Sequence, residues 1–169
     1  HQRQAVRVLA DLDQSRFDPR DVEDILDSNV QDLSGGELQR TVIAASLGRA
    51  ADLYLLDEPS AYLDVEQRLR MAKAVRRIIE SKGSAAFVVD HDVLTVDYLS
   101  DRLLVFKGSP GREGKASGPL EMHEGMNEFL QEVGVTFRRD DRTGRPRVNK
   151  PGSRLDSEQK ERGEYYYTG

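Results

Sequence analysis

Two adjacent carboxylates, Asp57 and Glu58, stand at the end of a short apolar run and are the residues best suited to chemistry. The run, Leu53–Leu56, is typical of a buried parallel strand. Two like charges at such a strand end repel each other and lose hydration, so a cation beside them would stabilise both. Asp57 is therefore a candidate Mg²⁺ ligand through water, and Glu58 a candidate to activate an attacking water. A polar turn after an ordinary strand would look the same, because strand ends are often acidic.

A helix start with two glycines lies upstream of this strand. Ser34 and Glu37 form an S-x-x-E capping box, and a helix is predicted from Ser34 to about Gly48. Gly35 and Gly36 each cost about 1 kcal/mol relative to alanine in a helix. Bare backbone at a helix N-terminus offers free N–H groups and partial positive charge to a bound phosphate. An ordinary capping box followed by a flexible turn is the alternative interpretation.

The elements that must position these residues follow a regular order. We expect strands at 53–56, 85–89 and 102–106 and helices at 64–82 and 93–99. This alternation is typical of a parallel α/β sheet, whose ligand lies at the carboxyl ends of the strands. Asp57, Glu58 and His91 fall at those ends. Since a histidine in a turn is often only polar surface, His91 by itself would not indicate a site.

One segment downstream of these strands looks like a second phosphate-binding site. Residues 108–115 have the glycines and the lysine of a phosphate-binding loop, but the spacing is one residue too long and Ala116 replaces the required Ser or Thr. We interpret this segment as a surface loop, so the sequence contains no P-loop. Elsewhere we expect two short helices within 1–30 and a helix at 125–133. We also expect short strands at 135–140 and 144–150 around a turn at 142–144. The segment Tyr165–Tyr167 should dock on the body of the chain.

Composition narrows the class of protein. The net charge is −5, with an acidic body over 1–133 and a basic tail over 134–169. A basic tail can contact nucleic acid, although a solvated extension would have the same composition. There is no cysteine, hence no disulfide and no Cys metal site, and no apolar run approaches the roughly 18 residues of a membrane helix. Because the chain starts at His1 and not at a methionine, we expect it to be a fragment. We expect the protein to be cytoplasmic.

In this order the motifs resemble those of ATP-binding-cassette (ABC) proteins. Leu33–Glu37 resembles their signature motif, Leu53–Glu58 their Walker B strand, Ser60–Asp64 their D-loop and His91 their switch histidine. The resemblance implies an α/β fold that is a partial P-loop NTPase, an ABC-type nucleotide-binding domain. It would contain part of the helical subdomain at about 1–50 and a catalytic part with the parallel sheet at about 51–124.

Further segments resemble the E subfamily, the ribosome-recycling ATPases also called RNase L inhibitors, in an archaeal-like form. These segments are 58–64, 88–92, 125–130, 136–140, 144–150 and 163–166. The resemblance implies the C-terminal part of a second nucleotide-binding domain over 1–124, followed by a hinge extension over 125–169. The iron–sulfur domain of the family, with its 4Fe–4S clusters, would lie in an N-terminal part that this sequence lacks.

The resemblance also assigns roles. The ATP-binding positions would be Ser34, Gly35, Gly36, Glu37 and Asp64, the first three meeting the γ-phosphate held by the other cassette. Asp64 would also tie the two cassettes together. In its own cassette, Asp57 would hold Mg²⁺, Glu58 would polarise the attacking water and His91 would hold the γ-phosphate.

The implied function is ATP-driven splitting and recycling of ribosomal subunits. The implied partners are the other nucleotide-binding domain, the small ribosomal subunit with its RNA, and a release or rescue factor, with no membrane. The P-loop lysine, the Q-loop glutamine and the adenine-stacking aromatic are missing from this sequence, so we expect the chain alone to bind ATP poorly and to hydrolyse none. Two alternatives remain open at this point: the ATPase subunit of a transporter, and a non-catalytic docking module.

Overall fold

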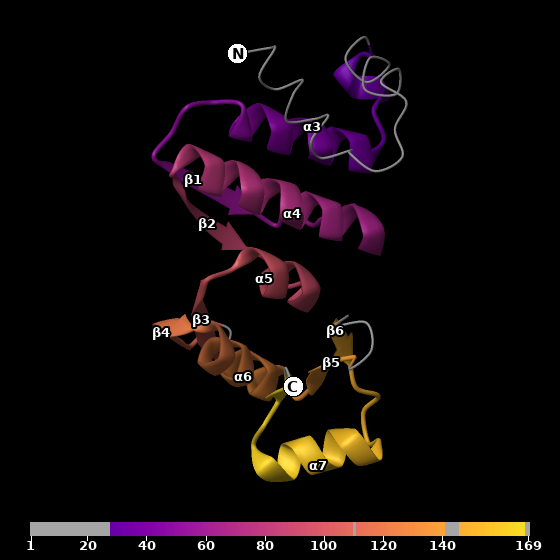
Figure 1. Ribbon diagram of the computed structural model, residues 1–169, viewed down its shortest axis with the longest axis vertical. Helices are drawn as coiled ribbons and strands as arrows, with labels where there is room; N and C mark the ends of the chain where they lie inside the picture. The colour runs from indigo at the N-terminus through magenta and orange to yellow at the C-terminus, as the bar shows by residue number, and fades with distance from the viewer. Residues whose placement is uncertain (1–27, 110, 141–145, 168–169) are drawn as a thin grey trace. The chain divides into compact units, whose positions relative to one another are not determined.

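The computed structural model describes residues 28–109, 111–140 and 146–167 (Figure 1). The chain divides into two compact units, His1–Leu99 and Ser100–Gly169, and each is described by itself. The helices predicted within residues 1–27 lie outside the described residues. The predicted boundary after residue 124 lies inside a helix rather than between the units, and where the hinge extension begins stays a prediction.

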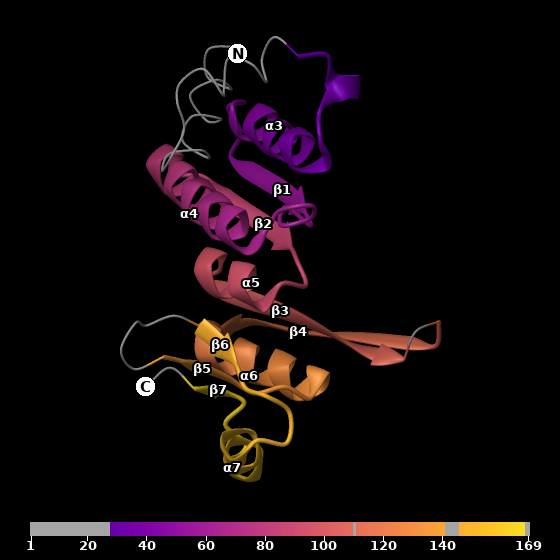
Figure 2. The same ribbon diagram turned by 90° about the vertical axis from the view of Figure 1, so that its right-hand side faces the viewer.

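The first unit is a two-stranded parallel sheet with helices packed on it. Its elements are η1 Val30–Asp32, α3 Gly35–Leu47, β1 Leu53–Asp57, α4 Val65–Lys82, β2 Ala85–Val89 and α5 Val93–Leu99. Strands β1 and β2 pair in parallel from Leu53 opposite Ala85 to Asp57 opposite Val89, and α4 forms the crossover between them (Figure 2). The predicted strands, helices and parallel pairing of this unit are confirmed.

Capping residues fix where the two long helices begin and end. Ser34 accepts the Glu37 N–H while the Glu37 carboxylate accepts the Ser34 N–H at 2.8 Å, so the predicted capping box is confirmed. Asp64 caps α4 in the same way with Gln67. Gly83 ends α4 with a left-handed φ of 62°, a conformation that glycine adopts at little cost.

Among the described residues of the first unit, the buried core lies on one face of the sheet. A buried cluster there joins α3, α4 and the strands through Ile43, Ala44, Leu47, Tyr54, Leu56, Leu63, Met71, Ala74, Val75 and Ile78. On the other face Leu55 and Val89 are 73% and 65% exposed. The expectation of a strand buried on both faces is therefore wrong within this unit, because alternate side chains of β1 point away from the cluster.

The described residues of the second unit form two small sheets and two helices. Its elements are β3 Arg102–Ser109, β4 Glu113–Glu121, α6 Met122–Val133, β5 Phe137–Arg139, β6 Pro146–Val148, α7 Arg154–Arg162 and β7 Tyr166–Tyr167. Helix α6 packs on β3, where a Cβ at Gly125 would lie 2.7 Å from Leu103 Cβ. Only a glycine permits so close an approach of helix and strand.

Two predictions about the β3 region are wrong. Residues 102–106 are not the third strand of the parallel sheet, because β3 pairs antiparallel with β4 in a separate hairpin. Residues 108–115 are not simply a surface loop, since they form the facing ends of the two strands around a short turn. The β4 segment is rich in glycine and charged residues, which are depleted in strands. The local sequence therefore did not indicate that β4 is a strand that pairs with β3.

The second small sheet joins three distant segments. Strand β5 pairs antiparallel with β6, so the two predicted short strands are confirmed. Strand β5 also pairs in parallel with β7, which was not predicted as a strand. The predicted turn at 142–144 lies outside the described residues. Tyr166 is 4% exposed and stacks on Phe137, with ring centroids 5.2 Å apart. Its N–H also donates to the Asn127 side chain of α6 at 3.2 Å, so the predicted docking of the tyrosine segment on the body of the chain is confirmed. Helix α7, capped by Ser153, was not predicted.

A buried polar network connects α7 to the strands of this sheet. The Thr136 hydroxyl donates to Asp156 at 2.7 Å, and the Asn149 side-chain amide donates to Thr136 at 3.0 Å. Gln159 donates to the Phe137 carbonyl at 3.1 Å. These donors and acceptors satisfy one another, as buried polar groups must.

Asp156 gives the second unit a testable pH dependence. Bonds from the Thr136 hydroxyl, the Gly152 N–H and Lys160 lower the pKa of Asp156 from 3.8 to about 2. A carboxyl whose pKa is lowered by folding stabilises the fold above its unfolded pKa and loses that contribution as the pH falls toward its folded pKa. We expect Asp156→Asn to destabilise the chain near pH 6 and the difference from wild type to shrink between about pH 4 and pH 2.

Thermal unfolding of the chain at several pH values checks this prediction. The exposed carboxylate Asp52 supplies the control, because Asp52→Asn makes the same chemical change outside the network. A destabilisation by Asp156→Asn that is equally large at pH 2.5 and pH 6 would contradict the assignment.

Candidate functional site

The carboxyl ends of β1 and β2 bring the predicted catalytic residues together. Asp57 lies opposite Val89 in the register, and the Glu58 N–H donates to the Val89 carbonyl at 2.7 Å, which extends the pairing past the strand end. Glu58 Oε1 then lies 3.4 Å from His91 Nδ1. Both side chains are open to solvent, at 56% and 74% exposed, so a ligand can reach them. Their roles in catalysis stay predictions.

Glu58 adopts an unusual backbone conformation. Its φ is 44°, in the left-handed region that residues other than glycine rarely occupy. Strained backbone of this kind persists only where surrounding contacts hold it, and it occurs often at functional sites. Here one contact comes from α3, where the Gln39 amide donates to the carbonyls of Glu58 at 3.2 Å and Pro59 at 3.3 Å.

Asp57 is exposed at the end of β1 beside this turn. In the part of the chain that the structure describes, no three His, Asp or Glu side chains gather into a metal-binding group. An exposed single carboxylate fits Mg²⁺, which commonly takes one or two protein carboxylates and completes its octahedron with water and substrate phosphates. The structure thus places Asp57 suitably, and its role as a metal ligand stays a prediction.

The residues that resemble the ABC signature motif lie at the N-terminus of α3. Helix geometry leaves the N–H groups of Gly35 and Gly36 without intrahelical partners. The Ser34 hydroxyl and N–H both donate to the Glu37 carboxylate, and these bonds lower the pKa of Glu37. Glu37 is therefore an anion engaged by Ser34, while the two glycine N–H groups remain available to a phosphate.

The two glycines have a second role that sequence reasoning missed. A Cβ at Gly35 would lie 3.3 Å from Cδ1 of Tyr62, and one at Gly36 would lie 3.3 Å from the Tyr62 carbonyl oxygen. Tyr62 itself has a left-handed φ of 61° and is 80% exposed. Access for a phosphate is therefore not the whole reason for bare backbone here, because Tyr62 packs against both residues.

Asp64 is exposed and its carboxylate accepts the Gln67 N–H at 2.8 Å as the cap of α4. The structure thus gives it a local capping role, and its predicted contact with a second cassette stays a prediction.

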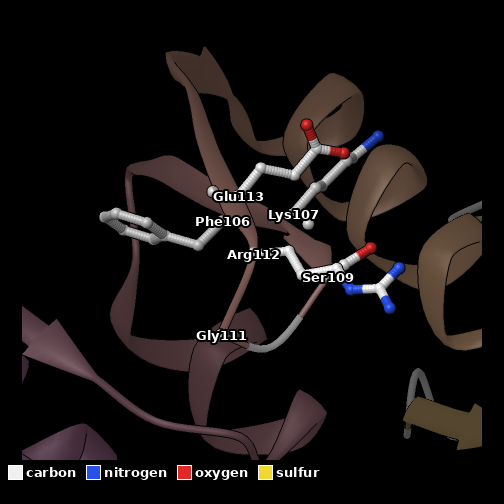
Figure 3. A pocket seen from close by; sticks show the side chains of 8 residues that line it. Phe106, Lys107, Ser109, Gly111, Arg112 and Glu113 are labelled. Carbon is white, nitrogen blue, oxygen red and sulfur yellow. The ribbon is translucent and has the colours of Figure 1, made fainter.

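Three contributors to the site, Gln39, Tyr62 and Asp90, had no individual role in the sequence analysis. Tyr62 lies inside the segment that resembles a D-loop and Asp90 stands beside His91, so these two had a signal, whereas Gln39 had none. A shallow pocket in the second unit contains none of the predicted site residues. It lies at the β3–β4 hairpin, where Phe106 points away from Lys107 and Arg112 (Figure 3).

Comparisons with known proteins agree with this architecture. The ABC transporter family model matches residues 1–61. An SMC ATPase structure, 19% identical, aligns with a TM-score of 0.52 and shows the fold alone. The fold of this chain is part of an ABC-type nucleotide-binding domain. Its defining features are the parallel strands β1 and β2, the crossover helix α4 and the carboxylates at the strand ends.

More similar proteins identify the family. The chain is 59% identical over 89% of its length to an uncharacterised ABC transporter ATP-binding protein of Methanocaldococcus jannaschii. It is 48% identical over 88% of its length to translation initiation factor RLI1 of Saccharomyces cerevisiae. A crystal structure of archaeal ribosome recycling factor aABCE1 with the ribosomal stalk protein aP1 aligns over 97% of this chain and 34% of that one, at 55% identity and a TM-score of 0.81. The chain belongs to the E subfamily of ABC proteins, the RNase L inhibitor family.

The chain spans about a quarter of the length of the curated relatives it matches, 25% and 24% for the two proteins named. Among the described residues, no helix has the length and apolar character needed to cross a membrane.

Proposed function

We propose that the protein carrying this chain hydrolyses ATP and uses it to split and recycle ribosomal subunits. The observation that supports hydrolysis most directly is the 3.4 Å approach of Glu58 to His91 at the carboxyl ends of parallel strands, beside Asp57. Glu58 would polarise the attacking water, His91 would hold the γ-phosphate, and Asp57 would hold Mg²⁺ through water. Catalysis of this kind consists of positioning and charge stabilisation.

The N-terminus of α3 would serve a second ATP. Ser34, Gly35 and Gly36, with Glu37 beside them, would meet the γ-phosphate bound to the other nucleotide-binding domain, and Asp64 would lie at the boundary between the two domains. The anion-binding geometry of α3 supports this proposal. The 4Fe–4S clusters that the family resemblance implies would be bound by an N-terminal region of the full-length protein.

The ribosomal part of the proposal is supported by the relatives. One similar structure is a complex of aABCE1 with a ribosomal stalk protein, and another, 56% identical with a TM-score of 0.81, is a model of ribosome-bound archaeal Pelota and ABCE1. We therefore propose the small ribosomal subunit, its RNA and a release or rescue factor as partners, and the cytoplasm as the place of action. Basic side chains of the second unit would contribute contacts to RNA.

Co-sedimentation with purified ribosomal subunits tests this function. The full-length protein is mixed with a non-hydrolysable ATP analogue and compared with a double charge reversal, Arg147→Glu with Lys150→Glu. Both residues are exposed, whereas Arg138 donates to Asn149 at 3.0 Å and is left intact to protect the fold. A matched control reverses two exposed basic residues of the hairpin, Arg112→Glu with Lys115→Glu.

We expect the wild type and the hairpin control to pellet with the small subunit and the tail variant to pellet less. If the wild type does not pellet, the ribosomal function is wrong. If both charge reversals lose binding equally, the contact depends on overall charge rather than on the tail.

The isolated chain provides a further prediction. Because this sequence contains no P-loop to hold the phosphates, we expect the purified 169-residue chain to bind ATP weakly and to release no phosphate above the blank. A phosphate-release assay with saturating Mg²⁺ and ATP checks this. Clear turnover that Glu58→Gln abolishes would contradict the prediction.

A further inference from the structure

The carboxylate of Asp90 joins the two loops that follow β1 and β2. Its Oδ1 accepts the Ser60 hydroxyl at 2.8 Å and its Oδ2 accepts the Ser60 N–H at 3.2 Å. The same Oδ1 accepts the Asp92 N–H at 2.8 Å, which closes the turn around His91. Ser60 is 1% exposed, so water does not compete for its two donors.

This link lies next to both proposed catalytic side chains. Ser60 is two residues after Glu58, and Asp90 immediately precedes His91. Glu58 and His91 are themselves largely exposed, so their own contact cannot fix their separation against solvent. Their spacing therefore depends on how the two backbone loops are held together.

Asp92, the other carboxylate of this turn, performs a different task. It pairs with Arg68 and accepts the N–H groups of Leu94 at 2.8 Å and Thr95 at 3.0 Å, which caps α5. Among the two acids that flank His91, Asp90 is the one that contacts the loop after β1.

We propose that Asp90 is a positioning residue for ATP hydrolysis: its carboxylate locks the Ser60 loop to the His91 turn and so keeps Glu58 and His91 in register. The inference rests on the proposed ATPase function. Both carboxylate oxygens accept hydrogen bonds from the loops, whereas an asparagine has one acceptor oxygen and an amide that only donates. Asp90→Asn therefore keeps the size of the side chain, replaces the oxygen that accepts the Ser60 N–H with a group that only donates, and so weakens the link.

Steady-state kinetics of the full-length protein give the first test. Loss of geometry without loss of binding lowers kcat, and a displacement of about 1 Å can cost about 10²-fold. We expect Asp90→Asn to lower kcat by about that factor with an unchanged KM for ATP, and the control Asp52→Asn to match wild type. Ser60→Ala removes the hydroxyl bond to the same side chain. Because Ser60 and Asp90 act through one contact, the double variant should lose less activity than the two single losses combined. A raised KM with unchanged kcat, or fully additive losses, would overturn the proposal.

Amide hydrogen exchange of the full-length protein without ATP gives the second test. Asp90→Asn should speed exchange in both loops, at residues 60–63 and 91–93, and leave the α4 amides unchanged, which shows that the fold is retained. Faster exchange in only one loop would overturn the link. If Asp90→Asn fails to fold, Ser60→Ala, which keeps the Ser60 N–H bond, is measured in its place. A wild type that exchanges as expected but does not turn over ATP would contradict the proposed function, while the exchange result still decides the link.

Discussion

Glu58→Gln in the full-length protein should abolish most ATP turnover while ATP-dependent closure of the protein persists. Glutamine has nearly the same size and keeps one acceptor oxygen, but it cannot take a proton from the attacking water. A positioned general base typically contributes about 10²–10⁴-fold, so a loss in this range is expected. Phosphate release at saturating Mg²⁺ and ATP measures turnover, and subunit co-sedimentation with ATP measures closure.

The matched control for this variant is Glu132→Gln on α6, an exposed glutamate of the second unit that the proposed mechanism does not use. It should hydrolyse ATP as the wild type does. If Glu58→Gln also leaves turnover unchanged, Glu58 does not act in the reaction. The alternative of a non-catalytic docking module would then be favoured.

Phe137→Ala should cost the second unit about 3–5 kcal/mol of unfolding free energy, the range for truncating a buried phenylalanine. The Phe137 side chain is 0% exposed and stacks on Tyr166, so its removal leaves a cavity between β5 and β7. Since small domains have only about 5–15 kcal/mol of stability in total, this loss would remove much of the margin.

Urea unfolding followed by tyrosine fluorescence measures this change, because the chain contains six tyrosines and no tryptophan. Phe106→Ala is the control, since Phe106 is 77% exposed and the same truncation there should change stability by less than about 0.5 kcal/mol. Equal destabilisation by the two variants would show that Phe137 does not lie in a core.

Local chemistry decided which elements the sequence could predict. Helices α3 and α4 begin at capping residues and were located from them, and β1 and β2 are short apolar runs joined by a crossover helix. Strand β4 and helix α7 have no comparable pattern. Strand β4 exists because β3 supplies its hydrogen bonds, and α7 is fixed partly by the buried side chains of Asp156 and Gln159. Such partners are distant in sequence, so no local window contains them.

In the candidate site, too, the sequence predicted what local patterns determine and missed what distant contacts impose. The rule that ligands lie at the carboxyl ends of parallel strands brought Glu58 and His91 together correctly. The contacts of Gln39 and Asp90 depend on a sharp turn with left-handed backbone at Glu58, which no neighbouring glycine signals. Propensity rules cannot anticipate a conformation that tertiary contacts impose.

The left-handed backbone at Tyr62 also determines which substitutions this position will tolerate. In a saturation library at this position, selected for folded protein, glycine, asparagine and aspartate should be recovered most often, because they enter this region of φ at the lowest cost. Valine, isoleucine and threonine should be depleted most, since branching at Cβ makes the same φ strained. The aromatic ring lies over Gly35, so a second selection, for activity, would separate the need for the ring from the need for the turn.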